Sequence, residues 1–264
     1  MSGFAIETFE LTRTFGAQTA VDHLSLQVPE GSFYGFLGPN GAGKSTTINM
    51  LTGLLSPTSG SARILGLDLA KDDLEIKRRI GVVPDGLHLF ERLSGEDQLR
   101  FVGEVQGLAP PVAKRRAGEL LEAMDLTASA RKLVAGYSHG MRKKLALSCA
   151  LIHEPKLLFL DEPFEGVDAV STSEIRELLQ RLVSQRHVTV FLTSHVLEVV
   201  ERLCTHVGIV SGGKLVANGS LDDLRRGEHG ETSTLEELFL SRVGGSRGDA
   251  TAGLGWLTDG EAAE

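Results

Sequence analysis

The stretch that decides the fold of this 264-residue chain is Gly38-Pro39-Asn40-Gly41-Ala42-Gly43-Lys44-Ser45-Thr46. It fits the pattern G-x-x-x-x-G-K-[ST], in which a glycine-rich loop turns its main-chain N–H groups toward phosphate oxygens. The apolar run 33–37 before it is typical of a buried strand, and residues 46–55 after it have helical spacing. This strand–loop–helix context predicts a nucleotide-phosphate site, in which Lys44 reaches the β- and γ-phosphates and Ser45 holds Mg²⁺.

The overall composition is that of an ordinary globular protein, with 41% hydrophobic and 23% charged residues. The formal net charge is −8 and no basic stripe is present, so we expect no nucleic-acid partner. Cys149 and Cys204 lack Cys-x-x-Cys spacing, which argues against a zinc site or a disulfide framework and fits a reducing compartment. Because we find neither a leader nor an apolar run of roughly 20 residues, we expect a cytoplasmic chain that reaches a membrane only through a partner.

The rest of the chain alternates between strand and helix patterns, apart from one helical stretch. We expect strands at 4–11, 24–28, 63–67 and 80–83, with a turn at 56–60. From about residue 93 to 154 strands are not evident; helices begin at Ser94, run over 111–124 and open at 137–140. A strand at 156–160, a helix at 171–184, a strand at 188–193 and a helix at 195–203 follow. This alternation predicts an α/β fold with a parallel sheet and a helical insert.

Polar residues follow two of these strands at the end where ligands bind in open α/β sheets. Asp161 and Glu162 come directly after the apolar run 157–160. Asp161 is suited to hold Mg²⁺ beside Ser45, and Glu162 to polarise a water for attack on the γ-phosphate. His195, after the strand that ends near Thr193, is suited to touch the γ-phosphate and orient that water.

The chain resembles an ATP-binding subunit of an ABC transporter over roughly residues 4–240. The matching segments occur in the family's order and spacing: 38–46, 137–141, 157–162, 164–168 and 194–195. The resemblance implies an α/β fold with a P-loop NTPase core and mostly parallel sheet, an N-terminal antiparallel β-subdomain and an inserted α-helical subdomain. It implies an ATP-binding domain over 1–243, with the insert at about 93–154, followed by a C-terminal tail at 244–264.

The resemblance also assigns roles to individual residues. Phe15 would stack on adenine and Val21 would flank the base. Ser138 and Gly140 would face the nucleotide bound by a second subunit, and Asp168 would cross the interface between subunits. Glu162 would be the catalytic base, His195 the switch histidine and Lys44 a catalytic phosphate ligand. The remaining nucleotide contacts would come from the loop itself: Gly38, Pro39, Asn40, Gly41, Ala42, Gly43, Ser45 and Thr46.

Two departures from the family pattern stand out. The usual Leu-Ser-Gly-Gly-Gln signature is Tyr137-Ser138-His139-Gly140-Met141 here, a form that resembles the type-2 exporter branch. Met141 replaces a glutamine that contacts ribose across the interface. Asp85 stands where most members have a glutamine that meets Mg²⁺ and the membrane subunit; an aspartate can still ligate Mg²⁺, but its charge repels phosphate.

We therefore expect an ATP- and Mg²⁺-dependent ATPase that pairs with a second ATP-binding subunit and powers export through a separate transmembrane permease. It would lie on the inner face of the cell membrane, with the permease docked on residues 86–106. Two alternatives remain open: a soluble ABC-type ATPase acting on ribosomes or DNA, and a nucleotide sensor with low turnover.

Overall fold

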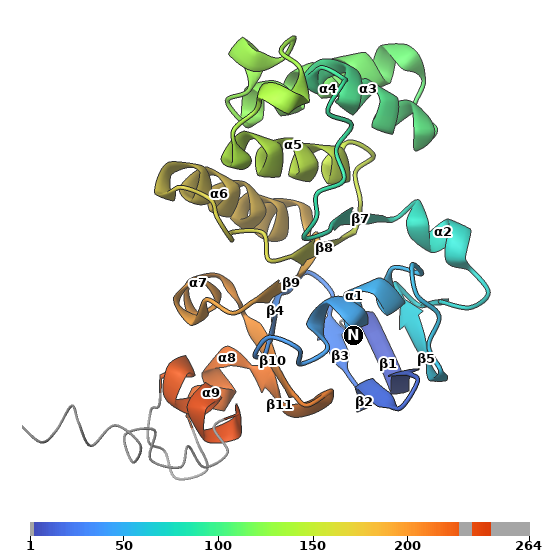
Figure 1. Cartoon of the computed structure of the whole chain (residues 1–264), viewed down its shortest axis with the longest axis vertical. Coiled ribbons are helices and arrows are strands. Elements are labelled where there is room, and N and C mark those ends of the chain that lie inside the picture. Colours follow the sequence, from blue (N-terminus) through green and yellow to red (C-terminus); the bar gives the residue numbers. More distant parts are fainter. Residues whose placement is uncertain (1–2, 227–233, 244–264) are drawn as a thin grey trace, which may run out of the picture.

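Two sheets and a layer of helices build the protein, as the computed structural model of residues 3–226 and 234–243 shows (Figure 1). The larger sheet has six strands in the order β11-β10-β4-β9-β8-β7. β11 is antiparallel to β10, and the other neighbouring strands are parallel, which confirms the mostly parallel sheet. Its strands are β4 (Phe33–Leu37), β7 (Ile80–Val83), β8 (Leu157–Asp161), β9 (Thr189–Ser194), β10 (His206–Ser211) and β11 (Lys214–Ser220).

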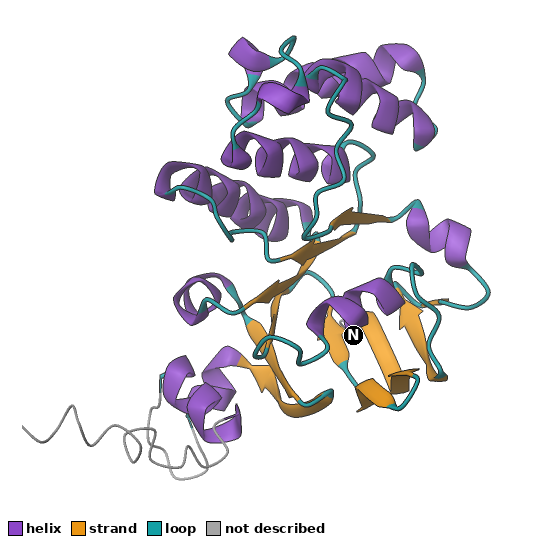
Figure 2. Cartoon of the chain, viewed as in Figure 1, coloured by secondary structure: helices purple, strands orange, loops and turns teal. Residues whose placement is uncertain are grey.

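The smaller sheet is antiparallel and is formed by the N-terminal part of the chain, as expected (Figure 2). Its long central strand β1 (Phe4–Phe15) pairs with three others. The partners of β1 are β2 (Gln18–Leu24), β3 (Gln27–Pro29) and β5 (Ser59–Ile64), and β5 also pairs with the short β6 (Leu67–Asp68).

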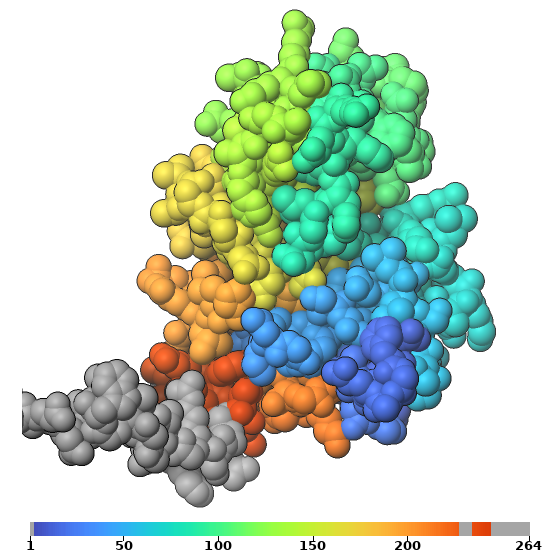
Figure 3. Space-filling model, in the orientation of Figure 1, coloured from blue at the N-terminus to red at the C-terminus, as the bar shows by residue number. Residues whose placement is uncertain are grey.

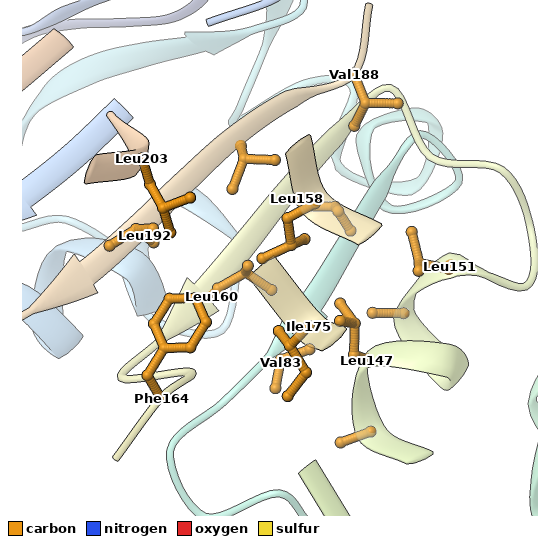
Figure 4. Packing of buried hydrophobic residues seen from close by; sticks show 14 of the residues in the cluster. Val83, Leu147, Leu151, Leu158, Leu160, Phe164, Ile175, Val188, Leu192 and Leu203 are labelled. Carbon is orange, nitrogen blue, oxygen red and sulfur yellow. The ribbon is translucent and has the colours of Figure 1, made fainter. Parts of the chain in front are cut away.

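Successive side chains along the strands of the large sheet point to opposite faces, because a strand has a period of two. They therefore belong to two separate hydrophobic cores, one on each face of the sheet. Leu157 and Phe159 of β8 pack toward the antiparallel sheet and helix α1 (Lys44–Leu51). Leu158 and Leu160 point to the opposite face, where Leu147 of α5 (His139–Leu151) and Ile175 of α6 (Ala169–Arg186) cover them (Figure 4). The central strands are thus covered on both faces, which explains their continuous apolar sequence.

The segment predicted as a helical insert lies at one end of the molecule (green in Figure 3), and its buried side chains belong to the same core as one face of the large sheet. It contains α3 (Gly95–Val105) and α4 (Pro110–Ala123), two short 3₁₀ turns (Thr127–Ser129 and Val134–Gly136) and α5. Ser94 caps α3 by accepting a hydrogen bond from the Asp97 N–H, as its position before an acidic first turn predicts. Between residues 93 and 154 the structure contains no strand, only an isolated bridge between Ser94 and Leu133.

Several predicted strand boundaries are wrong. β1, predicted over 4–11, continues to Phe15. β2 ends at Leu24 and β3 starts at Gln27, because the Thr8 hydroxyl donates to the Leu24 carbonyl and accepts from the Leu26 N–H, bridging the break. β5 begins at Ser59, inside the predicted turn, and stops at Ile64 because Leu65 turns with a φ of 51°.

The helix after the phosphate loop is shorter than the predicted 46–55. It ends at Leu51 because Gly53 adopts a left-handed conformation with φ of 72°, a common way to stop a helix. The remaining helices of the described residues are α2 (Asp73–Lys77), α7 (Leu197–Leu203), α8 (Leu221–Arg225) and α9 (Leu235–Val243). Among the described residues, none of the helices is both long and apolar enough to cross a membrane. The predicted tail at 244–264 lies outside the described residues.

Candidate active site

The carboxyl ends of three neighbouring strands bring the candidate residues to one edge of the large sheet. The parallel register aligns Leu37 of β4 with Ser194 of β9, and Asp161 of β8 with Thr193 of β9. The residues that follow these ends are the phosphate loop, Glu162 and His195. Segments separated by more than 100 positions in the sequence therefore meet at one place, as the strand patterns predict.

The phosphate loop is tightly organised between β4 and α1. Gly43 has a φ of 99°, and a Cβ at this position would lie 2.4 Å from the Ala20 carbonyl oxygen, so only glycine fits. Lys44 is buried and its Nζ donates to the Gly38 carbonyl at 2.8 Å. The Lys44 ammonium is thus held within the loop, where it would meet a bound phosphate.

A cleft of about 450 Å³ opens above this loop. Twelve of its fourteen lining residues come from four segments: the β1–β2 hairpin, the loop with the start of α1, the strand end at Glu162, and His195. The predicted site residues that line it are Phe15, Asn40, Gly41, Ala42, Gly43, Lys44, Ser45, Thr46, Asp85, Glu162 and His195.

Phe15 stands at the rim of the cleft with one face already covered. Its side chain is 47% exposed, and the Arg13 guanidinium carbon lies 4.5 Å from the ring centroid. Arg13 is itself fixed by a 2.9 Å hydrogen bond from Nη1 to the Ser56 carbonyl. Because Arg13 covers only one face of the ring, the opposite face of Phe15 is exposed and suited to stacking on a base.

Several predicted site residues do not line this cleft. Val21 is buried beneath the loop, close to Gly43, so its contact with a base stays a prediction. Asp161 lies just behind Glu162 and is also buried. The Gly38 and Pro39 carbonyls face Lys44 rather than the cleft. Ser138, Gly140 and Asp168 gather elsewhere, at the start of α5 and α6.

The main chain of Glu162 is held in an unusual conformation. Its φ of 47° is left-handed, which is uncommon for a residue with a side chain. The Thr193 hydroxyl accepts from its N–H at 3.1 Å, and the buried Lys143 Nζ donates to its carbonyl at 2.7 Å. Side-chain anchors from β9 and α5 therefore hold a conformation that the residue would not adopt freely.

The Glu162 carboxylate lies between two candidate partners. Its Oε2 is 3.1 Å from His195 Nδ1, and its Oε1 is 3.8 Å from Lys44 Nζ. The Glu162 side chain is only 13% exposed, whereas that of His195 is 46% exposed. This carboxylate therefore lines the cleft directly beside the imidazole of His195.

The oxygen donors at this edge fit a magnesium ion. Ser45 and Asp85 line the cleft, and the Thr193 hydroxyl donates to Asp161 Oδ1 at 2.5 Å, which orients the Asp161 carboxylate. Among the described residues we find no group of three or more His, Cys, Asp or Glu side chains that could hold a metal. Proteins commonly hold Mg²⁺ through one or two carboxylates together with waters and substrate phosphates.

A second set of contacts joins the start of α5 to the segment after Glu162. Ser138 is exposed and caps α5 by accepting from the Met141 N–H at 3.2 Å. His139 Nε2 lies 3.3 Å from the Glu165 carbonyl. A Cβ on Gly140 would lie 3.1 Å from Asp168 Oδ2. The N-terminus of α5 thus presents the exposed residues Ser138 and His139 to the outside, a position suited to an anion, while Gly140 is buried and the flank of the helix is fixed to segment 162–168.

Asp168 also has a role within its own chain. Its Oδ1 accepts from the N–H groups of Val170 and Ser171, so it is the N-cap of α6. The Ser171 N–H, followed by the Ser171 hydroxyl, holds the pKa of the Asp168 carboxyl below its usual range.

Known proteins share this arrangement. The family model for ABC transporter matches residues 21–165. The bacitracin transport ATP-binding protein of Bacillus licheniformis is 41% identical over 221 residues, covering 84% of this chain and 71% of that protein. The chain belongs to the ABC transporter family.

Two further comparisons extend the match over most of this ABC protein. The linearmycin resistance ATP-binding protein of Bacillus subtilis (strain 168) is 36% identical over 244 residues, covering 90% of this chain and 78% of that protein. A solved ATP-binding subunit of an ABC transporter superposes with a TM-score of 0.83 at 31% identity, covering 90% of this chain and 98% of that one. The chain is an ATP-hydrolysing ABC transporter subunit, which confirms the expected fold and enzyme class.

Some residues around the ABC site were not found from the sequence. Gln18, Ala20 and Glu165 line the cleft, Thr193 links Asp161 to Glu162, and Lys143 holds the Glu162 carbonyl. Glu165 lies within the matching segment 164–168 and Thr193 directly precedes the segment 194–195, so these segments could have indicated both residues. Lys143 belongs to the short basic run 142–144, in which the sequence does not distinguish a buried lysine from an exposed one.

Proposed function

We propose that two ATP-binding subunits close head-to-tail over two ATP molecules, and that closing and opening drive a membrane permease. One observation carries this proposal. The cleft of a single chain holds the phosphate loop, Glu162 and His195, whereas Ser138 opens α5 outside that cleft and is exposed. A helix N-terminus that offers N–H groups and a hydroxyl away from its own nucleotide is suited to the nucleotide of a second subunit.

Within each site, Glu162 is the general base. Its carboxylate accepts the proton of the attacking water while the oxygen of that water bonds to the γ-phosphorus and the bond to ADP breaks. His195, 3.1 Å from Glu162, orients the water and the γ-phosphate, and Lys44 neutralises charge on the β- and γ-phosphates. Ser45, Asp161 and Asp85 would hold Mg²⁺, which supplies further neutralisation of phosphate charge when bound.

The permease would dock beside the cleft, on the surface between Asp85 and the end of α3. Phe90 and Phe101 are both about half exposed there, with ring centroids 5.4 Å apart in an edge-to-face pair. Val105, one helical turn further along α3, is 69% exposed. Exposed apolar side chains that gather in this way are typical of a protein interaction site. The subunit would thereby sit peripherally on the inner face of the cell membrane.

The substrate class follows from the relatives alone. The two curated relatives serve bacitracin transport and linearmycin resistance. We therefore infer that the complex exports a toxic small molecule and protects its host. The substrate contacts would lie in the permease.

The test is the Mg²⁺-dependent ATPase rate of the purified chain as protein concentration rises. If two subunits must meet to complete each site, the rate per subunit increases with concentration and levels off once the dimer is formed. Size-exclusion chromatography with ATP identifies the concentrations at which only monomer is present. The composite site would be contradicted if the rate per subunit remained substantial and constant down to those concentrations.

Replacing Phe101 with Asp is expected to uncouple the subunit from the membrane without impairing its chemistry. A carboxylate in the exposed pair would have to be desolvated on docking, which opposes complex formation. We expect the chain to move from washed host membranes to the soluble fraction, and the purified variant to retain wild-type ATPase activity. Phe9→Asp is the matched control, since Phe9 is similarly exposed but lies on β1 in the antiparallel sheet. Equal retention of both variants on membranes would contradict docking at Phe101.

A further inference from the structure

Lys143 is a buried lysine whose ammonium group lies behind the catalytic edge. It belongs to the second turn of α5 and is 3% exposed. Its Nζ donates to the Glu162 carbonyl at 2.7 Å. A buried ammonium group is costly unless it is hydrogen-bonded and faces negative charge, so its surroundings must supply both.

Four carboxylates supply the negative charge. Burial lowers the pKa of Lys143, and the carboxylates of Asp85, Glu165, Glu162 and Asp161 oppose this, Asp85 most strongly. All four lie at the edge of the sheet where a triphosphate would bind, and such a concentration of negative charge repels the nucleotide. Lys143 lines a small internal cavity together with Val83, Leu160 and Pro163, the residues that flank Asp85, Asp161 and Glu162 in sequence, and it does not line the cleft. Its ammonium group therefore faces the acidic groups of the site from the protein side.

We propose that Lys143 is a positioning residue that anchors the backbone of Glu162 and offsets the charge of Asp85. The hydrogen bond holds Glu162 in its left-handed conformation, so that its carboxylate reaches the cleft. The charge makes the aspartate at position 85 compatible with a bound triphosphate. The inference rests on the proposed role of Glu162 as the base. Through Lys143, it connects α5, whose first turn would face the partner's nucleotide, to the base of the same chain.

The neighbouring Lys144 provides a matched control. It is also buried on α5, with 7% exposure, but it forms an ion pair with Glu174 of α6. Removing Lys144 therefore costs a partly buried ion pair between α5 and α6, and it leaves the contacts of Lys143 with Glu162 in place. Any general effect of deleting a buried lysine from α5 will be common to both positions.

The experiment is a double-mutant cycle on the purified chain, with kcat and KM for MgATP measured in Lys143→Met, Asp85→Asn and the double variant. Loss of a charge-assisted hydrogen bond predicts about a tenfold fall in kcat for Lys143→Met. Because the unbalanced Asp85 charge opposes ATP binding, KM is expected to rise as well. Asparagine lacks the charge of Asp85 but keeps an oxygen that can ligate Mg²⁺. Adding Asp85→Asn is therefore expected to return KM most of the way to the wild-type value and leave kcat low. Lys143→Gln, which lacks the charge but remains polar, serves the same cycle if Lys143→Met does not fold.

The outcomes separate this inference from the proposed function. Lys144→Met is expected to lower the melting temperature, with a KM that Asp85→Asn does not rescue. The inference is overturned if Lys143→Met keeps kcat and KM within twofold of wild type, or if Asp85→Asn changes KM equally in both lysine backgrounds. A Glu162→Gln variant that remains fully active would instead refute the proposed base.

Discussion

Glu162→Gln is expected to lower kcat for ATP hydrolysis by about 10²–10⁴-fold, the usual contribution of a general base. The amide cannot accept a proton from the attacking water, yet it is almost the same size as the carboxylate. The Thr193 and Lys143 anchors bind the main chain of Glu162, so they persist in the variant. Phosphate release measures turnover, and a fluorescent ATP analogue is expected to bind with unchanged or tighter affinity.

The control for this variant is Glu177→Gln, which makes the same chemical change on the exposed face of α6. It is expected to keep wild-type turnover. Size-exclusion chromatography with ATP completes the test, because a chain that binds but does not hydrolyse ATP should accumulate as a closed dimer. Turnover within threefold of wild type in Glu162→Gln would rule out Glu162 as the base.

Ser138→Asp is expected to abolish turnover by a different route, again with a loss of at least about 100-fold. Aspartate caps a helix as well as serine does, so α5 should begin where it begins now. The new carboxylate, however, would face the triphosphate bound by the partner subunit and repel it. Ser138→Asn, which caps equally well without the charge, is expected to lose much less activity. ATP binding to each chain's own cleft should be unchanged in both variants.

Mixing the two inactive variants tests the head-to-tail arrangement directly. A dimer of one Glu162→Gln chain and one Ser138→Asp chain contains one site with both changes and one site with neither. Statistical mixing then predicts recovery of about a quarter of wild-type activity, if each site acts independently. An inactive mixture would contradict independent composite sites, whereas activity of Ser138→Asp alone would contradict the contact of Ser138 with the partner's nucleotide.

The strand ends explain why much of the site could be predicted from sequence. Lys44, Glu162 and His195 each follow an apolar strand, and parallel strands align their carboxyl ends, so their meeting in one cleft requires no further information. The helical insert was equally visible, since capping residues such as Ser94 mark its helices.

Other features depend on contacts that a linear pattern does not contain. The break between β2 and β3 depends on the hydroxyl of Thr8, sixteen residues before Leu24. Strands β10 and β11 were not predicted, although β10 lies directly beside the phosphate-loop strand β4. The burial of Lys143 depends on how α5 packs against the sheet, and the composition of the basic run 142–144 gives no indication of it.

The strand order of the large sheet has a consequence for folding during synthesis on the ribosome. Strand β4 is complete by Leu37, but its two neighbours, β9 and β10, begin only at Thr189 and His206. In a growing chain, β4 therefore lacks both of its sheet neighbours during the synthesis of some 150 residues, about ten or more seconds at ordinary elongation rates. Pairing of strands across such a sequence separation is also slow, because the entropy cost of closing a long loop comes before the contacts that stabilise the pair. Nascent chains released before Ser211 should be unable to hold ATP, and the ability to bind it should arise late and abruptly as β10 leaves the exit tunnel.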